Sequence, residues 1–377
     1  MNPLIQLKTT PPLLIILTLL CFTLLPPVQA SPDPGSVDPF NTADGDHALF
    51  SNTTGVANSA FGWYALFANT DGSNNTAVGA LALDLNTGND NTTVGTAALL
   101  LNTGSDNTAV GVAALETNST GSNNTASGAF ALLSNSTEVA NTASGGRALF
   151  SNTEGNFNTA TGFFALHDNI GGTGNTANGA SALLHNTTGG LNTAVGGNAL
   201  LSNTEGTDNT ATGVNALASN IDGVENTAAG AFALDSNTTG NDNTATGFQA
   251  LSNNTTGVQN TASGVLALSS NTGGVQNTAN GYRALFSNIG GTLNCAVGVD
   301  ALFHNTAGVA NVAMGGQALS FATTGSSNVA LGFNAGLSVE TADNVICIGN
   351  ECLVMMLTTA ATSATSGSSQ AARRRCM

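Results

Sequence analysis

The chain has 377 residues, of which 41% are hydrophobic and only 7% charged, and because intrinsic disorder usually combines few hydrophobic residues with many charges, this composition favours a folded protein. Its formal net charge is −16, and between residues 31 and 372 the only Lys or Arg side chains are Arg147 and Arg283. A surface so poor in cations cannot neutralise phosphates, so we expect no binding to nucleic acid or to anionic lipid.

The N-terminus has the pattern of a secretory signal peptide. Lys8 precedes an apolar stretch from Leu13 to Leu25, and small residues follow up to Ala30. This order predicts that residues 1–30 are removed and that the rest of the chain is exported. An uncleaved membrane anchor is the alternative, but a span normally needs about 20 apolar residues, so we expect no membrane span in the mature chain. Residues 31–40, rich in Pro and Asp, are expected to form a disordered linker.

A 17-residue unit, approximately N-T-A-x-G-x-x-A-L-x-x-N-T-x-G-x-x, repeats from Asn41 to about residue 357. Positions in the unit are numbered from its first Asn. A pair of helices would need about 30 or more residues per repeat, whereas short strands and turns fit the observed length. We therefore predict an all-β, single-domain parallel β-solenoid over residues 41–357, with about nineteen coils.

Each unit is expected to contain two short strands. In the first, N-T-A-x-G, Ala at position 3 faces a cramped interior, while positions 2 and 4 face outward because strand side chains alternate. The second is placed near positions 6 to 11 and buries Leu at position 9. One buried Leu stabilises by about 1.5–3 kcal/mol, whereas ordering the backbone costs about 1–2 kcal/mol per residue, so a single coil cannot fold alone. The predicted core includes Leu66, Leu83, Leu99, Leu115, Leu200 and Leu217.

Asn at positions 1 and 12 is predicted to form two ladders. In a parallel stack, equivalent residues lie over one another at about 4.8 Å. Each side-chain amide can then bond to the next, as in other in-register β structures. This assigns the Asn residues a structural role. The ladder residues that we name are Asn75, Asn91, Asn107, Asn192, Asn209 and Asn226.

The C-terminal end departs from the repeat. The apolar stretch up to Leu357 is expected to cover the open end of the stack, and residues 358–377 are expected to be disordered. Cys347 and Cys352 could form a disulfide bond in an oxidising compartment, or they could remain two buried thiols in adjacent turns.

No catalytic, cofactor-binding or metal site is predicted. His185 and His304 occupy the same position of the unit, but seven coils separate them, or about 34 Å, so they cannot share a metal ion. Acidic residues such as Asp71 and Glu154 fall in the variable turn at positions 14 to 17, usually one per coil, which is typical of a solvated edge. We therefore expect no enzymatic activity.

The units Asn75–Gly79, Asn192–Gly196 and Asn344–Gly349 resemble the S-V-A-I-G strand of YadA-like heads in trimeric autotransporter adhesins. The resemblance extends from Asn41 to about Leu353. It implies a left-handed β-roll that assembles as a homotrimer at a bacterial surface, in association with the outer membrane. It also implies that the protein binds a host matrix protein, glycans or other cells.

These observations favour a secreted or cell-surface structural and adhesive fibre. An ice-binding β-solenoid is the first alternative, because Thr at position 2 would form a flat column beside small residues. A structural protein similar to a tail fibre is a further alternative. A polysaccharide-cleaving β-helix enzyme is the least favoured, since the sequence indicates no acidic or basic cleft.

Overall fold

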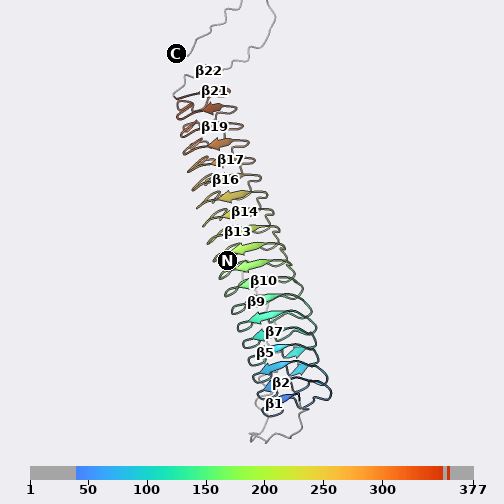
Figure 1. The fold of residues 1–377 in the computed structure, drawn as a ribbon. Coiled ribbons are helices and arrows are strands. Elements are labelled where there is room, and N and C mark those ends of the chain that lie inside the picture. Colours follow the sequence, from blue (N-terminus) through green and yellow to red (C-terminus); the bar gives the residue numbers. More distant parts are fainter. Residues whose placement is uncertain (1–39, 351–354, 357–377) are drawn as a thin grey trace, which may run out of the picture. The chain divides into compact units, whose positions relative to one another are not determined.

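The computed structural model describes residues 40–350 and the backbone of residues 355–356, and within these residues it contains strands and turns but no helix. The chain divides into two compact units, one ending at Asn158 and the other beginning at Thr159. Each unit is a stack of coils joined by parallel strands (Figure 1). The described chain has about 18 coils in total, and equivalent positions of successive coils are ~17 residues apart in the sequence. The predicted all-β parallel β-solenoid is confirmed. The predicted signal peptide, residues 31–39 of the linker and the tail at 358–377 lie outside the described residues.

In the first unit, positions 2 to 4 of each coil form a strand of three residues. Successive strands pair in parallel with no shift in register, so that Thr76 lies opposite Thr92. The parallel strands of the first unit that pair in this way are β1 (Thr42–Asp44), β2 (Ser59–Phe61), β3 (Thr76–Val78), β5 (Thr92–Val94), β7 (Thr108–Val110), β8 (Thr125–Ser127) and β9 (Thr142–Ser144).

The second unit shows the same pattern, and Thr176 lies opposite Thr193. At its C-terminal end β22 (Met355–Met356) pairs antiparallel with β21. The parallel strands are β10 (Thr159–Thr161), β11 (Thr176–Asn178), β12 (Thr193–Val195), β13 (Thr210–Thr212), β14 (Thr227–Ala229), β15 (Thr244–Thr246), β16 (Thr261–Ser263), β17 (Thr278–Asn280), β18 (Cys295–Val297), β19 (Val312–Met314), β20 (Val329–Leu331) and β21 (Val345–Ile348).

The second strand predicted near positions 6 to 11 is wrong for most coils. Among the described residues it survives only as two short parallel strands, β4 (Leu85–Asn86) and β6 (Leu101–Asn102). Both belong to coils in which one residue is missing from the following turn. In all other described coils this segment is a chain of turns.

Left-handed backbone conformations replace this strand. In the second coil, Tyr64 has φ 56° and Leu66 has φ 52°, values that cost an L residue about 1–2 kcal/mol. The N–H of Tyr64 donates to the carbonyl of Asp46 at 3.0 Å, and the N–H of Leu66 donates to that of Ala82 at 3.0 Å. These bonds to the coils on either side, together with complete burial of Leu66, offset the strain.

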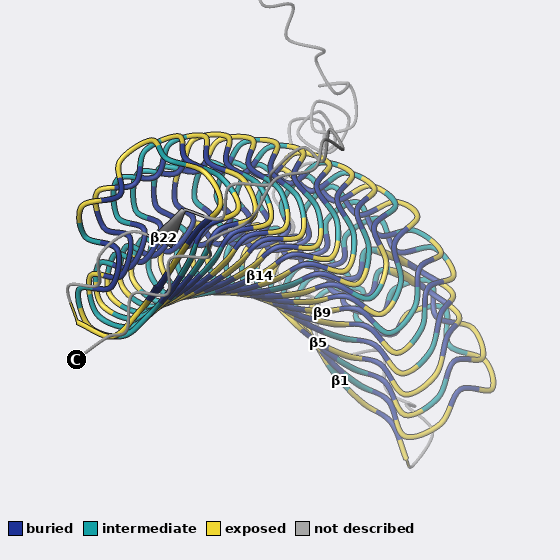
Figure 2. Cartoon of the chain, turned by 90° about the horizontal axis from the view of Figure 1, so that it is seen from above, coloured by how far each residue is buried: buried dark blue, intermediate teal, exposed yellow. Residues whose placement is uncertain are grey.

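The interior consists of Ala at positions 3 and 8 and Leu at position 9. The Gly at position 5 lets the stacked coils approach closely: Gly62 has φ 132°, and a Cβ atom there would lie 2.6 Å from the carbonyl oxygen of Gly79. Figure 2 shows that buried residues recur at the same place in successive coils. The six Leu side chains predicted for the core, all fully buried, are Leu66, Leu83, Leu99, Leu115, Leu200 and Leu217.

Asn at position 12 forms a ladder from amide to amide. In the second unit, Nδ2 of Asn203 donates to Oδ1 of Asn186 at 2.8 Å, and Nδ2 of Asn220 donates to Oδ1 of Asn203 at 2.8 Å. In the first unit, Asn118 donates to Asn102 in the same way at 2.8 Å. These amides are buried, so the ladder also satisfies polar groups that water cannot reach.

Asn at position 1 forms the predicted ladder from amide to amide in many coils and, in addition, bonds to the backbone. Oδ1 of Asn192 accepts a hydrogen bond from the Asn209 amide at 3.2 Å and another from the backbone N–H of Asn209 at 3.0 Å. The Asn209 amide also donates to the carbonyl of Gly223 at 2.8 Å, which Asn220 reaches at 2.9 Å. One glycine carbonyl therefore joins positions 1 and 12 of the same coil. The six residues named for the ladder, all fully buried, are Asn75, Asn91, Asn107, Asn192, Asn209 and Asn226.

The two described cysteines differ in state. Cys295 is a free thiol, and Cys347 is disulfide-bonded. The partner of Cys347 therefore lies outside the described residues, as does Cys352, with which a bond was considered. The described part of the chain contains no helix with the length and hydrophobicity that crossing a membrane requires.

Candidate functional site

The outward face of the parallel sheet presents a regular array of side chains. In β13, Thr210 and Thr212 are exposed while Ala211 between them is buried. Because the strands pair without a shift, the Thr residues at position 2 lie over one another at about 4.8 Å. In the second unit this file comprises Thr159, Thr176, Thr193, Thr210, Thr227, Thr244, Thr261 and Thr278. Among the described residues, no hydrogen bond engages their Oγ1 atoms.

The chemistry of this face changes along the second unit. Position 4 is mainly polar from β10 to β17, as in Thr161, Asn178 and Ser263, although Val195 and Ala229 interrupt the series. In β18 to β21 both outward positions become largely apolar, and Met314 and Ile348 are exposed there. The hydroxyl-bearing part of the face is therefore confined to the earlier strands of this unit.

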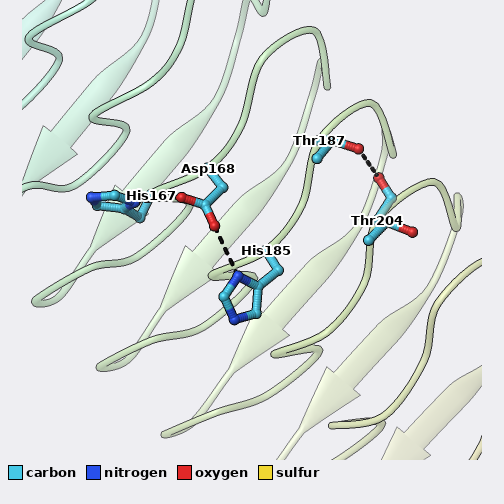
Figure 3. Close-up of polar contacts among 5 residues, drawn as sticks. All are labelled: His167, Asp168, His185, Thr187 and Thr204. Carbon is cyan, nitrogen blue, oxygen red and sulfur yellow. Dashed lines mark hydrogen bonds and ion pairs between the residues drawn. The ribbon is translucent and has the colours of Figure 1, made fainter. Parts of the chain in front are cut away.

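A second polar feature lies on the turns of the coils after β10 and β11 (Figure 3). Asp168 lies between two histidines: Oδ1 is 2.6 Å from Nδ1 of His167, and Oδ2 is 2.8 Å from Nδ1 of His185. The hydrogen bond with His167 is the main cause that lowers the pKa of the Asp168 carboxyl, against the opposing effect of burial. Nearby, Oγ1 of Thr187 donates to the carbonyl of Thr204 at 2.9 Å, which ties two coils together.

The sequence analysis did not identify the contacts of Asp168 with His167 and His185, although the spacing of these residues in the repeat indicates them. Asp168 and His185 are 17 residues apart, one full repeat, so stacking brings them together. His304 has a separate environment, with Nδ1 2.9 Å from the carbonyl oxygen of Ser320. Within the part of the chain that the structure describes, no group of three or more His, Cys, Asp or Glu side chains could hold a metal ion.

Two successive coils of the second unit form what we call the arginine platform, made of Tyr282, Arg283, Asp300 and Phe303. Nε of Arg283 donates to Oδ1 of Asp300 at 2.9 Å and Nη2 donates to Oδ2 at 3.0 Å. The guanidinium carbon lies 4.8 Å from the ring centroid of Tyr282 and 4.9 Å from that of Phe303. Hydrogen bonding to Asp300 raises the pKa of Arg283. Charge and rings are thus mutually satisfied within the platform.

The chain matches no protein-family model, no curated protein and no solved structure. Its function is therefore inferred from the surfaces that the coils present.

Proposed function

We propose that the protein is a secreted or cell-surface structural and adhesive fibre that binds its ligand through the outward face of the sheet. The single observation that carries this proposal is the file of eight Thr side chains on β10 to β17, all in the same register. A ligand that itself repeats, such as a matrix protein or a glycan, can contact many equivalent positions at once. Such multivalent contact raises the overall affinity without requiring a strong individual contact.

The finer features of the resemblance to YadA-like heads belong to the same proposal. They are a left-handed roll of about nineteen coils, assembly as a homotrimer, and display in association with the outer membrane. The proposed role is binding to host matrix, glycans or other cells, without enzymatic activity. The in-register units between Asn41 and Gly349 support this proposal. Size-exclusion chromatography with light scattering tests the assembly, and a monomer would contradict the trimer.

Matched substitutions test the binding face. Thr244 and Thr261 lie exposed on the sheet, whereas Thr239 and Thr256 lie exposed in the turns at position 14. We expect Thr244→Lys with Thr261→Lys to reduce adhesion to collagen, immobilised glycans or cells by at least tenfold, because two bulky cations interrupt the file. Thr239→Lys with Thr256→Lys adds the same charge elsewhere and is expected to leave adhesion unchanged. Equal losses in both pairs, or no adhesion by the correctly folded parent chain, would contradict the proposal.

Ice binding is a second candidate, favoured by one specific observation. β10, β13 and β15 each present two outward Thr residues, so that hydroxyl and methyl groups recur both along and across the strands. Measurement of thermal hysteresis separates this candidate from adhesion. Ice binding predicts hysteresis that the paired Thr244→Lys and Thr261→Lys substitutions abolish, and a parent chain without hysteresis would exclude it.

A further inference from the structure

Aromatic side chains concentrate at one place in the first unit, in the turns that follow β1 and β2. The whole chain has 1 Trp and 2 Tyr, and Trp63 and Tyr64 are consecutive here. The equivalent positions of the next coil hold Ala80 and Leu81. The repeat itself therefore does not require rings at this place. We name the group formed by His47, Phe50, Trp63, Tyr64 and Phe67 the ring cluster.

The five rings of this cluster form one continuous set of contacts. Tyr64 lies at its centre, with ring centroids 4.9 Å from His47, 4.6 Å from Trp63 and 4.6 Å from Phe67. Phe50 stacks on Phe67 at 5.7 Å. Phe50 is 63% exposed, and Trp63, Tyr64 and Phe67 are half-buried. The cluster thus forms an aromatic surface that remains in contact with water.

Two carboxyl groups flank the ring cluster. Asp46 precedes His47 in the first coil, and Asp84 occupies in the third coil the position that Phe67 has in the second. A hydrogen bond of 2.8 Å from the N–H of Ala68 to the Asp84 carbonyl holds these two coils in register.

Each of these carboxyls has one oxygen that is buried and has no hydrogen-bond partner within the described chain: Oδ2 of Asp46 and Oδ1 of Asp84. The other oxygen of Asp46 lies 2.9 Å from Nδ1 of His47, in a geometry that makes no hydrogen bond. Burial raises the pKa of Asp84 to about 6. An unsatisfied buried acceptor costs about 1–3 kcal/mol, so both carboxyls lack full hydrogen-bond satisfaction within the chain. Each side chain is half-buried, so part of it reaches the surface beside the rings.

We propose that the ring cluster, together with Asp46 and Asp84, is a binding site for a neutral carbohydrate. A sugar ring has an apolar C–H face that packs on aromatic side chains, and its hydroxyl groups can donate to the half-buried carboxyl groups of Asp46 and Asp84 at the edge of the rings. Anionic glycans are disfavoured, because the site contains two acidic groups and the chain carries a formal net charge of −16. The site is separate from the Thr file of the sheet and adds a second binding site to the adhesive fibre proposed above.

The chain itself supplies the readout for this proposal. Trp63 is the only Trp in the sequence, so Trp fluorescence reports on this site alone. The full mature chain is titrated with a soluble β-glucan, a chitin oligosaccharide and a mannan, while polygalacturonate serves as the anionic comparison. We expect a saturable change in emission with at least one neutral glycan and none with polygalacturonate. If the rings only shield the end of the stack, we expect no saturable change in Trp emission with any of the glycans.

Variants locate the binding. Tyr64→Ala removes the central ring and Asp84→Ala removes one free acceptor, and each is expected to weaken glycan binding at least tenfold by calorimetry. Asp84→Asn keeps an acceptor oxygen and is expected to retain most of the affinity. Tyr282→Ala alters the arginine platform and is expected to change nothing. Circular dichroism checks that each variant is folded.

The outcomes separate this inference from the proposed function. Adhesion to surfaces without any neutral-glycan signal overturns the carbohydrate site and leaves the adhesive function standing. Glycan binding that survives both Tyr64→Ala and Asp84→Ala overturns the site, as does binding of polygalacturonate alone. If the folded chain shows no adhesion and no glycan binding, both proposals are overturned. Glycan binding that Tyr64→Ala abolishes, in a chain whose adhesion is insensitive to substitutions on the sheet, supports the site and overturns the sheet as the binding face.

Discussion

The ring cluster of the first unit and the arginine platform of the second unit use similar residues to different effect. Both place aromatic rings beside a carboxyl group on the turns that follow the sheet strands. In the platform, Arg283 occupies both oxygens of Asp300 and lies over two rings. In the cluster, Asp46 and Asp84 each keep one buried oxygen without a partner. The carboxyl of the platform is thus fully paired, whereas the two carboxyls of the cluster are not.

This difference teaches that identical coils can carry individual chemistry. The backbone, the core and the Asn ladders repeat in both units, so they do not determine which turns bind. Residues at positions 6, 7 and 10 vary without disturbing the coil, because their side chains leave the interior to Ala and Leu. Sites on such a scaffold are therefore sought where residues depart from the repeat.

The largest expected effect tests whether the buried core stabilises the coils of the ring cluster and of the arginine platform equally. Leu66 lies in the core of the coil with Tyr64, and Leu285 lies in that of the coil with Arg283; both are fully buried. We expect Leu66→Ala and Leu285→Ala each to lower the free energy of unfolding by about 2–5 kcal/mol, since each leaves a cavity. Urea denaturation measures both, with Leu→Met at each site as the control. A negligible cost at Leu66 alone would show that the first coils are not supported in the same way.

The next effect concerns the free carboxyl of Asp84, whose pKa is about 6 in the folded chain and 3.8 as its ordinary value. As pH rises from about 4 to about 6, the unfolded chain ionises before the folded one, so this group lowers stability. Asp84→Asn is therefore expected to raise the free energy of unfolding at pH 7 by about 1 kcal/mol, since water still screens the half-exposed group. At pH 4 the gain should vanish. A gain of equal size at both pH values would argue against ionisation as its cause.

The smallest effect concerns the carboxyl of Asp300, which is paired with Arg283. Unlike Asp84→Asn, its substitution is expected to lower stability. Asp300→Asn removes the charge partner of Arg283, so we expect a small decrease in melting temperature at low salt. The decrease should shrink in high salt, because ions screen a pair at the surface. Tyr282→Phe keeps the ring under the guanidinium and serves as the control. A stabilising effect of Asp300→Asn would contradict the distinction between satisfied and unsatisfied carboxyls.

The sequence predicts the coil and its register well, because Ala at position 3, Leu at position 9 and Asn at positions 1 and 12 have one consistent arrangement in a parallel stack. It does not reveal the left-handed conformations at Tyr64 and Leu66, since neither residue favours them alone and they are stabilised by bonds to neighbouring coils and by the burial of Leu66. The second strand was wrong for this reason.

The candidate sites were harder to predict than the coil. The pair of Asp168 and His185 follows from a separation of one repeat, but their contact depends on the direction of each side chain. The concentration of rings around Trp63 is visible in the sequence, yet the free oxygens of Asp46 and Asp84 require knowledge of every neighbouring donor. Hydrogen-bond satisfaction is a property of packed atoms, and residue types alone do not show it.

The shared carbonyl that joins positions 1 and 12 of one coil, such as that of Gly223, affects how easily the gene can gain or lose a repeat. Most of the described coils are closed by contacts among their own residues, and the upper and lower surfaces of such a coil offer the same partners to whatever lies next. In-frame duplication or loss of one repeat therefore exchanges one neighbour for an equivalent one. A scaffold with this property can lengthen or shorten by recombination while its remaining turns keep their individual ligands.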